Sequence, residues 1–455
     1  MEKTDILQKI VEAPATALDN VASEVEIIEN KVTDKSLVGR GVNYIKHLGP
    51  GLVSGAADDD PSGIATYSQA GAQFGTSMLW LAAWTFPLMA TIQEMCARIA
   101  LVTGRGLAAN MKHSYSRRVL YFATALLFIA NTLNIGANLG AMAKAIQLIF
   151  PFFNFVFLII LIGLTCLLLQ VFITYKSYAK YLKWLAITLL AYVATGLIIH
   201  MDWARIIYDG LVPHITFSKE NILLITGVLG TTISPYLFFW QTSQEVEEEI
   251  SIGKTTAHSR RGANDDEIKN MRVDIWSGMF LSNLVMFFII AVCATTLYAN
   301  GITNINTAAD AAEALRPLAG NAAYLLFALG IIGTGMLAVP VLAGSTAYAI
   351  SESLGYKEGL YRKLAKAKAF YGIIIISVVL GIIINFIGID PIKALIYSAI
   401  ANGIVAPVIL VCIVHMSGSH KIMGKYKNSK LKNVVGWTIT AVMTLAAIGA
   451  IISMF

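Results

Sequence analysis

Three consecutive carboxylates precede a proline inside an apolar part of the chain. Asp58, Asp59 and Asp60 open the stretch DDDPSG, and small or apolar residues flank it on both sides. Ionisable side chains are costly within a membrane, and those that occur there usually serve a function. The chemistry that this stretch predicts is the binding of a cation.

A second apolar run is interrupted in a similar way. Thr231, Ser234 and Pro235 lie in TTISPYLF, within an otherwise apolar run. Proline removes a backbone donor and disfavours helix at the preceding residue, so both runs should unwind at these points. Unwound backbone at membrane depth is tolerated where it lines a cavity, and its free carbonyls are ready cation ligands. Ordinary proline kinks are the alternative explanation for either break alone.

The composition is that of an integral membrane protein. Of the 455 residues, 56% are hydrophobic and 14% are charged, whereas soluble domains are nearer 25% charged. A membrane helix needs roughly 20 apolar residues, and about eleven segments qualify, which leaves little material for a soluble domain. The predicted spans are residues 43–72, 77–102, 118–148, 154–175, 178–200, 221–247, 273–299, 320–352, 367–388, 391–415 and 433–454.

Cysteines and charges argue against several other classes of protein. The four cysteines lie in apolar runs without paired spacing, so we expect core packing, with neither a disulfide framework nor a zinc site. The net charge of +6 is spread over short loops, which gives no basic patch for nucleic acid. No nucleophile and base pair, phosphate loop or zinc spacing indicates an enzyme, and we expect none. Residues 1–40 lack the apolar region of a signal peptide.

Lysine and arginine gather in alternate loops. They are frequent in residues 105–118, 176–183, 254–272, 357–368 and 421–432 and sparse in the loops between. Because short cytoplasmic loops carry the excess of these residues, the pattern predicts a cytoplasmic N-terminus and an outside C-terminus. We expect a multi-pass protein of the cell membrane, with the lipid bilayer as its surroundings and no obligate protein partner.

The two predicted breaks lie five spans apart. This spacing predicts two five-helix repeats of opposite orientation around a central site, an arrangement suited to alternating access. The predicted fold class is an all-α polytopic membrane protein of about 11 transmembrane helices. Its expected parts are a cytoplasmic tail (1–42), a first repeat (43–200), a second repeat (201–415) and an extra C-terminal helix with its loop (416–455).

Longer motifs resemble those of the Nramp family of divalent-metal transporters, and the resemblance covers most of the chain. GPG at 49–51, DPSG at 60–63 and QAGAQFG at 69–75 are similar to the family's first-span signature. CARIALVTGRGLA at 96–108 is similar to the sequence leading into its TGxxLA motif. The resemblance implies a fold of the amino-acid, polyamine and organocation transporter (LeuT-like) type, with a metal ion between the broken spans one and six.

The chain departs from the family at the metal site that this resemblance implies. Asp60 keeps the family's carboxylate, but Gly63 stands where the family has Asn. In span six Thr231 replaces an Ala, and SPY at 234–236 stands where the family has Met-Pro-His. Sulfur favours transition metals, whereas magnesium prefers oxygen ligands and keeps several waters. We therefore expect a wider, oxygen-lined cavity for hydrated Mg²⁺, with Mn²⁺ as the less favoured ion and no cofactor.

The residues that the family uses for proton movement are also replaced. Asn131 and Asn134 stand where the family has an Asp and a Glu in span three, and Tyr236 replaces its span-six histidine. Proton coupling at physiological pH needs groups that change protonation there. We expect uncoupled uptake driven by the membrane potential, similar to the Nramp-related magnesium transporters, a bacterial branch.

Further polar residues are candidates for the site. Asp58 and Asp59 either attract the cation and hold its water or lie solvated at a cavity mouth. Asn402, with Gly403, is expected to interrupt span ten near the metal. Gln241 either contacts the ion's path or packs between helices.

Other polar residues have two interpretations each. Asn131, Asn134 and Asn138 share one helix face, which either lines water or bonds helix to helix. Glu94 is either an acid facing the pathway or a structural residue, and the structural role is favoured. The acidic run at 245–249 either raises the local cation concentration or forms a solvated face, and the solvated face is favoured.

Two other transport functions remain open. One is the family's usual proton-coupled uptake of manganese or iron. The other is symport of an amino acid or another organic solute, although three aspartates at the first break would repel a substrate carboxylate.

Overall fold

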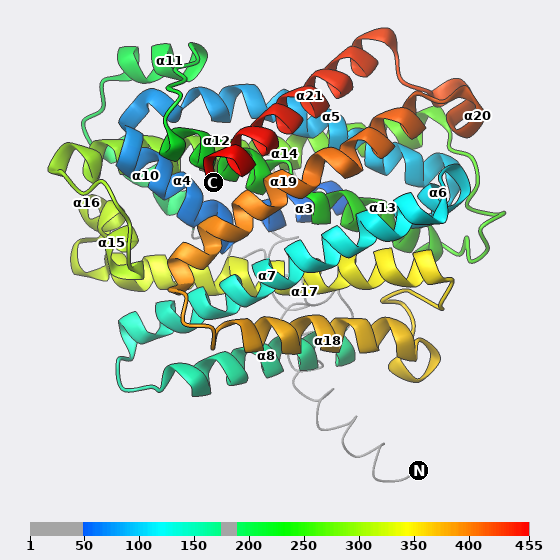
Figure 1. The fold of residues 1–455 in the computed structure, drawn as a ribbon, viewed down its shortest axis with the longest axis horizontal. Coiled ribbons are helices and arrows are strands. Elements are labelled where there is room, and N and C mark those ends of the chain that lie inside the picture. The colour runs from blue at the N-terminus through cyan, green and yellow to red at the C-terminus, as the bar shows by residue number, and fades with distance from the viewer. Residues whose placement is uncertain (1–48, 174–188, 455) are drawn as a thin grey trace, which may run out of the picture.

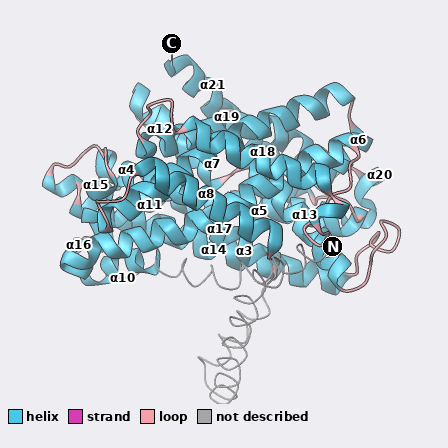
Figure 2. Cartoon of the chain, turned by 90° about the horizontal axis from the view of Figure 1, so that it is seen from below, coloured by secondary structure: helices cyan, strands magenta, loops and turns pink. Residues whose placement is uncertain are grey.

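The structure is a computed structural model that describes residues 49–173 and 189–454. These residues form helices joined by turns and loops, with no strand among them (Figure 2), so the all-α prediction is confirmed. The helices other than short 3-10 turns are α3 (Pro50–Asp58), α4 (Pro61–Phe74), α5 (Trp80–Thr103), α6 (Leu107–Ser114), α7 (Arg117–Ile149), α8 (Phe155–Phe172), α10 (Leu190–Ile198), α11 (Trp203–Leu211), α12 (Lys219–Thr232), α13 (Pro235–Ser251), α14 (Asp265–Thr296), α15 (Ala308–Ala312), α16 (Arg316–Ala319), α17 (Ala323–Leu354), α18 (Lys368–Ile384), α19 (Pro391–Gly418), α20 (His420–Met423) and α21 (Lys430–Met454).

Seven helical segments of the described chain are long and apolar enough to cross a membrane, and α18 is a shorter apolar helix. The broken pair α3 and α4 and the more polar α5 lie outside these seven. Polar residues explain this, because Asp59 and Asp60 separate α3 from α4, and α5 buries Gln93, Glu94 and Arg98. The predicted span 178–200 falls partly outside the described residues, so the count of eleven stays a prediction.

The long helices run side by side along the long axis of the molecule (Figure 1). In that view α11, α15 and α16 lie at one end and α6 and α20 at the other. The loops predicted outside and inside therefore gather at opposite ends. Helix α7 packs against α17, α18 and α19, while α14 packs against α3, α4 and α5.

Both predicted helix breaks are present at the centre of the bundle. Asp60 is the extended N-cap residue of α4, and Pro61 begins that helix. Ser234 is the extended N-cap residue of α13, and Pro235 begins it. Proline suits this first helical position, because the N–H that it lacks has no partner there in any helix. Helix α4 contacts α12, and α3 contacts α13, so the two broken spans lie together.

The prediction that Asn402 and Gly403 interrupt span ten is wrong. Helix α19 is continuous through both residues. Glycine serves close packing here: a Cβ at Gly403 would lie 2.5 Å from the Thr226 carbonyl oxygen. A Cβ on the facing Gly230 would lie 2.1 Å from the Ala399 carbonyl oxygen. Without side chains at 230 and 403, α12 and α19 approach backbone to backbone.

An acidic side chain anchors the start of α3. Asp274 on α14 accepts hydrogen bonds from the backbone N–H groups of Gly49 (2.9 Å) and Gly51 (2.6 Å). A carboxylate at a helix N-terminus satisfies donors that have no partner within the helix and complements the helix dipole. The first half of span one is thereby fixed against α14.

Candidate metal site at the broken helices

Asp60 is the most densely bonded of the three aspartates. Its Oδ1 accepts hydrogen bonds from Ser62 Oγ (2.5 Å) and from the Gly63 N–H (2.9 Å). Its Oδ2 accepts from the side-chain amides of Asn134 (3.2 Å) and Asn138 (3.1 Å) on α7. The residue is fully buried. Both carboxylate oxygens are thus fixed between the start of α4 and the polar face of α7.

Hydroxyl groups surround the second break. Ser234 Oγ donates to the Thr231 carbonyl (2.5 Å), and Thr231 Oγ1 lies 3.4 Å from Ser62 Oγ. Tyr236 donates its hydroxyl to the Ala57 carbonyl (2.9 Å) near the end of α3. These contacts satisfy carbonyls near the breaks and join span six to span one.

Asp58 and Asp59 both lie beside Ser282 of α14, a residue that the sequence pattern does not predict as part of the site. Ser282 Oγ on α14 lies 2.7 Å from Asp58 Oδ2 and 3.2 Å from Asp59 Oδ1. Ser282 is one small polar residue in an apolar span, and nothing in its local sequence marks it. The described residues contain no group of three or more His, Cys, Asp or Glu side chains able to hold one metal ion. The three aspartates therefore do not converge on a single point.

The asparagine stripe on α7 has two different roles. Asn131 donates to the Leu342 carbonyl and to the hydroxyls of Ser345 and Thr346, which ties α7 to α17. Asn134, by contrast, donates to Asp60 and accepts a hydrogen bond from Ser398 Oγ on α19 (3.1 Å). All of these contacts join α7 to other helices, so the helix-bonding interpretation is confirmed. That the stripe lines water stays a prediction.

Gln241 and Asn402 lie in different surroundings. Gln241 accepts from Ser54 Oγ (2.6 Å) and donates to Glu245 Oε1 (2.9 Å), which ties α13 to α3. Asn402 is fully buried, and its side-chain atoms have no hydrogen-bond partner among the described residues. Neither residue is hydrogen-bonded to Asp60, and their roles toward an ion stay predictions.

Glu94 has a structural role, as the sequence favours. It lies 3.2 Å from Arg272 Nε, contacts Lys432 Nζ, and accepts from the indole N–H of Trp276 (3.2 Å). These contacts join α5 to α14 and α21.

The acidic run at 245–249 is not a solvated face, apart from the exposed Glu248. Glu247 accepts hydrogen bonds from the Tyr348 hydroxyl (2.5 Å) and the Leu360 N–H (2.8 Å). Glu249 lies 2.6 Å from Lys254 Nζ. These carboxylates join α13 to α17 and to neighbouring loops. The sequence pattern alone does not distinguish such buried contacts from exposure to solvent.

The wider cavity predicted beside Gly63 is closed in this structure. A Cβ at Gly63 would lie 3.2 Å from the Tyr67 ring and 3.3 Å from both the Asp58 carbonyl and Thr231 Oγ1. The ring and the two oxygens fill the space that the missing side chain leaves. The conformation described is one in which the site is shut.

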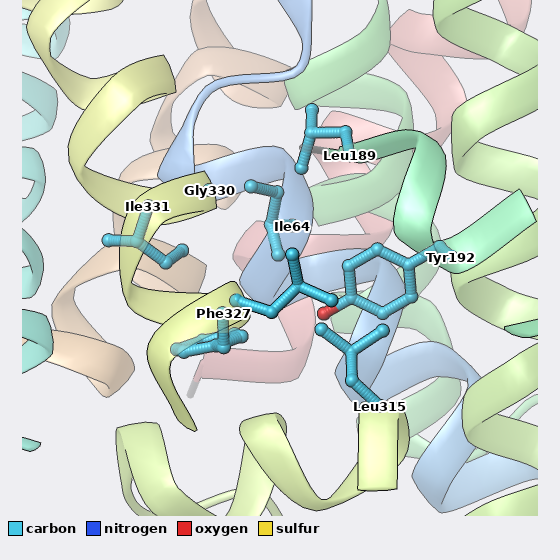
Figure 3. A pocket seen from close by; sticks show the side chains of 8 residues that line it. Ile64, Leu189, Tyr192, Leu315, Phe327, Gly330 and Ile331 are labelled. Carbon is cyan, nitrogen blue, oxygen red and sulfur yellow. The ribbon is translucent and has the colours of Figure 1, made fainter. Parts of the chain in front are cut away.

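Apolar side chains pack one helical turn beyond Asp60 (Figure 3). Ile64 of α4 lies there with side chains from α10, α17 and the turn before α16, and the space between them is only about 10 Å³. We call this set the apolar cluster; its labelled members are Ile64, Leu189, Tyr192, Leu315, Phe327, Gly330 and Ile331.

A larger pocket of about 420 Å³ lies at the end of the bundle that holds α6. Ser243 of α13 lines it, nine residues beyond Ser234, or roughly 13 Å along a helix. Burial raises the pKa of Glu358, in a loop of this pocket, above its usual range, against the effect of nearby Arg362 and Arg260. The charged residues that line this pocket include Arg105, Lys112, Arg260, Glu247, Glu352 and Glu358.

A family model decides the relationship that the motifs indicated. The model described as "Natural resistance-associated macrophage protein-like" (Nramp) matches residues 51–453. The chain belongs to the Nramp family. A divalent metal cation transporter, MntH, of Klebsiella pneumoniae is 24% identical over 408 residues, covering 87% of this chain and 91% of the relative. MntH of Aeromonas hydrophila is 24% identical over 406 residues, covering 87% of this chain and 93% of that relative.

Solved structures confirm the fold. A manganese transporter of Eremococcus coleocola superposes with a TM-score of 0.68 at 16% identity, covering 93% of this Nramp chain and 89% of that one. Mhp1, a nucleobase-cation-symport-1 family transporter, has a TM-score of 0.53 at 12% identity, covering 89% of this chain and 91% of Mhp1. MhsT, solved with L-phenylalanine, has a TM-score of 0.53 at 11% identity, covering 90% and 98%. The predicted LeuT-like fold is therefore correct.

Proposed function

We propose that the protein transports a divalent metal cation across the cell membrane, and that this cation is hydrated magnesium taken up without proton coupling. One observation carries the proposal: Asp60 lies at the break between α3 and α4, among hydroxyl and amide groups. From the second break, Thr231 Oγ1 lies 3.4 Å from Ser62 Oγ, which itself donates to Asp60. The two relatives named as divalent metal cation transporters support the class of substrate.

The bonding of Asp60 favours an ion that keeps its water. A bare cation at Oδ2 would face the amide hydrogens of Asn134 and Asn138, which already donate to that oxygen. A water of the hydration shell would instead donate to the same oxygen as the amides do. Magnesium sheds water reluctantly and is usually bound through one or two carboxylates, which suits this arrangement.

The replacement of acids by amides supports uptake without protons. The carboxamides of Asn131 and Asn134 do not titrate in the physiological range, and they occupy the positions where the family resemblance expects proton-carrying acids. A divalent ion gains about 4.6 kcal/mol on crossing 100 mV, twice the value for one charge. This energy drives accumulation without a second ion.

The second candidate is proton-coupled transport of manganese. Its support is the fold shared with the Eremococcus coleocola manganese transporter and the 24% identity to the MntH proteins. Transport of an organic solute has weaker support, since the likeness to Mhp1 and MhsT concerns the fold.

Uptake of Mg²⁺ into liposomes that contain the purified protein tests the proposal. We expect uptake that follows an imposed inside-negative potential and falls to the protein-free level in Asp60→Ala. Asp266→Ala is the matched control, because Asp266 is an exposed acid on α14 away from the breaks. Wild-type liposomes that admit Mn²⁺ but no Mg²⁺ would contradict the magnesium proposal.

A further inference from the structure

The three aspartates of the first break form two separate groups. Asp60 is bonded to four donors on α4 and α7. Asp58 and Asp59 share none of these donors and meet instead at Ser282 on α14. The pair and Asp60 therefore present their carboxylates to different surroundings.

The Asp58–Asp59 pair lacks a counter-charge in the described part of the chain. Asp58 is 0% exposed and Asp59 is 4% exposed. None of the ion pairs formed within residues 49–173 and 189–454 involves either side chain. Ser282 offers one hydroxyl proton, so it can donate fully to only one of the two carboxylates at a time. Buried carboxylates without a cation or sufficient donors are strongly unfavourable, so the pair needs a further partner.

Two further features point to a cation as that partner. Asp58 Oδ1 is buried and has no hydrogen-bond partner among the described residues, so one carboxylate oxygen is left as an open ligand. The pair also lies at the C-terminal end of α3, where unpaired carbonyls give a helix partial negative charge. The oxygen atoms and the local field both suit a hard, oxygen-binding cation.

We propose that Asp58, Asp59 and Ser282 form a second binding site, distinct from Asp60, for a divalent cation of the magnesium type. A divalent ion balances the two carboxylates, Asp58 Oδ1 supplies a free ligand, and Ser282 supplies a neutral oxygen. The site belongs to the α3 half of span one, on the side predicted to face the cytoplasm. The inference rests on the proposed function only in taking the transported ion as the ligand.

Binding of Mn²⁺ to the purified full-length protein tests the site, with free Mn²⁺ measured by electron paramagnetic resonance and Mg²⁺ added as competitor. In Asp60→Asn we expect one bound Mn²⁺ that Mg²⁺ displaces. Adding Asp58→Asn and Asp59→Asn to that variant should abolish the binding. Asn has nearly the shape of Asp, and thermal melting in detergent checks that each variant is folded.

A milder variant tests the role of the hydroxyl. In the Asp60→Asn background, Ser282→Ala should weaken Mn²⁺ binding about tenfold, the effect of losing about 1.4 kcal/mol. Ser277→Ala is the control, because Ser277 lies on the same helix and its hydroxyl donates to the Val273 carbonyl within it. An equal effect of both changes would contradict a specific role for Ser282.

Two outcomes would overturn the second site. If Asp60→Asn binds no Mn²⁺, a proton rather than a metal ion neutralises the pair. If Mn²⁺ binding persists when all three aspartates are Asn, the ion binds elsewhere. Uptake into liposomes tests the proposed function, whereas Mn²⁺ binding to the purified protein tests this second site. The proposed function and the second site can therefore fail separately.

Discussion

At the scale of single residues, three asparagines on one face of α7 have different hydrogen-bond partners. Asn134 and Asn138 donate to Asp60, whereas Asn131 donates to three groups on α17. The pattern of types and spacing is the same for all three. Only the elements that face each residue distinguish a contact with Asp60 from a contact with α17.

This difference predicts opposite effects of two similar substitutions. Asn138→Ala removes a hydrogen bond to a charged group, worth about 1.5–3 kcal/mol. We expect it to raise the KM for Mg²⁺ uptake by at least about tenfold. Asn131→Ala should lower the melting temperature in detergent and leave the KM nearly unchanged. Equal effects of the two variants on KM would show that the stripe acts as one unit.

The sequence could locate the two helix breaks at Asp60 and Ser234, because the proline that follows each residue disfavours a continuous helix. Gly63 was predicted to lie at the metal site only because its motif resembles that of the family. Ser282 could not be found in this way, since it lies more than 200 residues from Asp58 and a lone serine in a membrane helix has many uses. Its contact with Asp58 and Asp59 follows from the packing of α14 against α3.

At the scale of helices, the sequence located most elements from their apolar runs. The predicted span 118–148 corresponds to α7, and 433–454 corresponds to α21. The error at Asn402 and Gly403 has a physical cause, because glycine either weakens a helix or permits close approach of a neighbour. Sequence alone does not separate these uses, and the contact between α12 and α19 does.

Glycine positions on α12 predict a contrast in stability. Gly230→Ala should lower the melting temperature in detergent, since its Cβ would lie 2.1 Å from the Ala399 carbonyl oxygen and 2.3 Å from Gly403 N. Overpacking of this kind costs about 1–3 kcal/mol. Gly227→Ala is the control on the same helix, because its Cβ would have no neighbour nearer than 3.4 Å. A Gly230→Ala protein as stable as Gly227→Ala would disprove the close packing.

At the scale of the whole molecule, the central site is shut in this conformation. Asp60 is fully buried, and the apolar cluster leaves only about 10 Å³ one turn beyond it. The pocket of about 420 Å³ lies at the end that the loop charges predict to be cytoplasmic. The sequence predicted that the loops alternate between the two ends of the bundle. It did not predict the closed state, because that state depends on how side chains from distant helices pack.

The orientation in the membrane is a prediction for the whole chain. Most lysine and arginine residues lie in loops predicted to be inside, which places the C-terminal end of α21 outside. A tag fused to the C-terminus should therefore be cleaved by protease added to intact cells, and an N-terminal tag should be protected. Cleavage of the N-terminal tag alone would reverse the assignment of the two faces.

The central claim is that magnesium enters without protons. Its most direct test is a simultaneous record of luminal Mg²⁺ and luminal pH in liposomes with the wild-type protein, under an imposed inside-negative potential. We predict that luminal Mg²⁺ rises while luminal pH matches that of liposomes containing Asp60→Ala. A fall in pH that appears only when the metal is added and scales with its uptake would contradict the account.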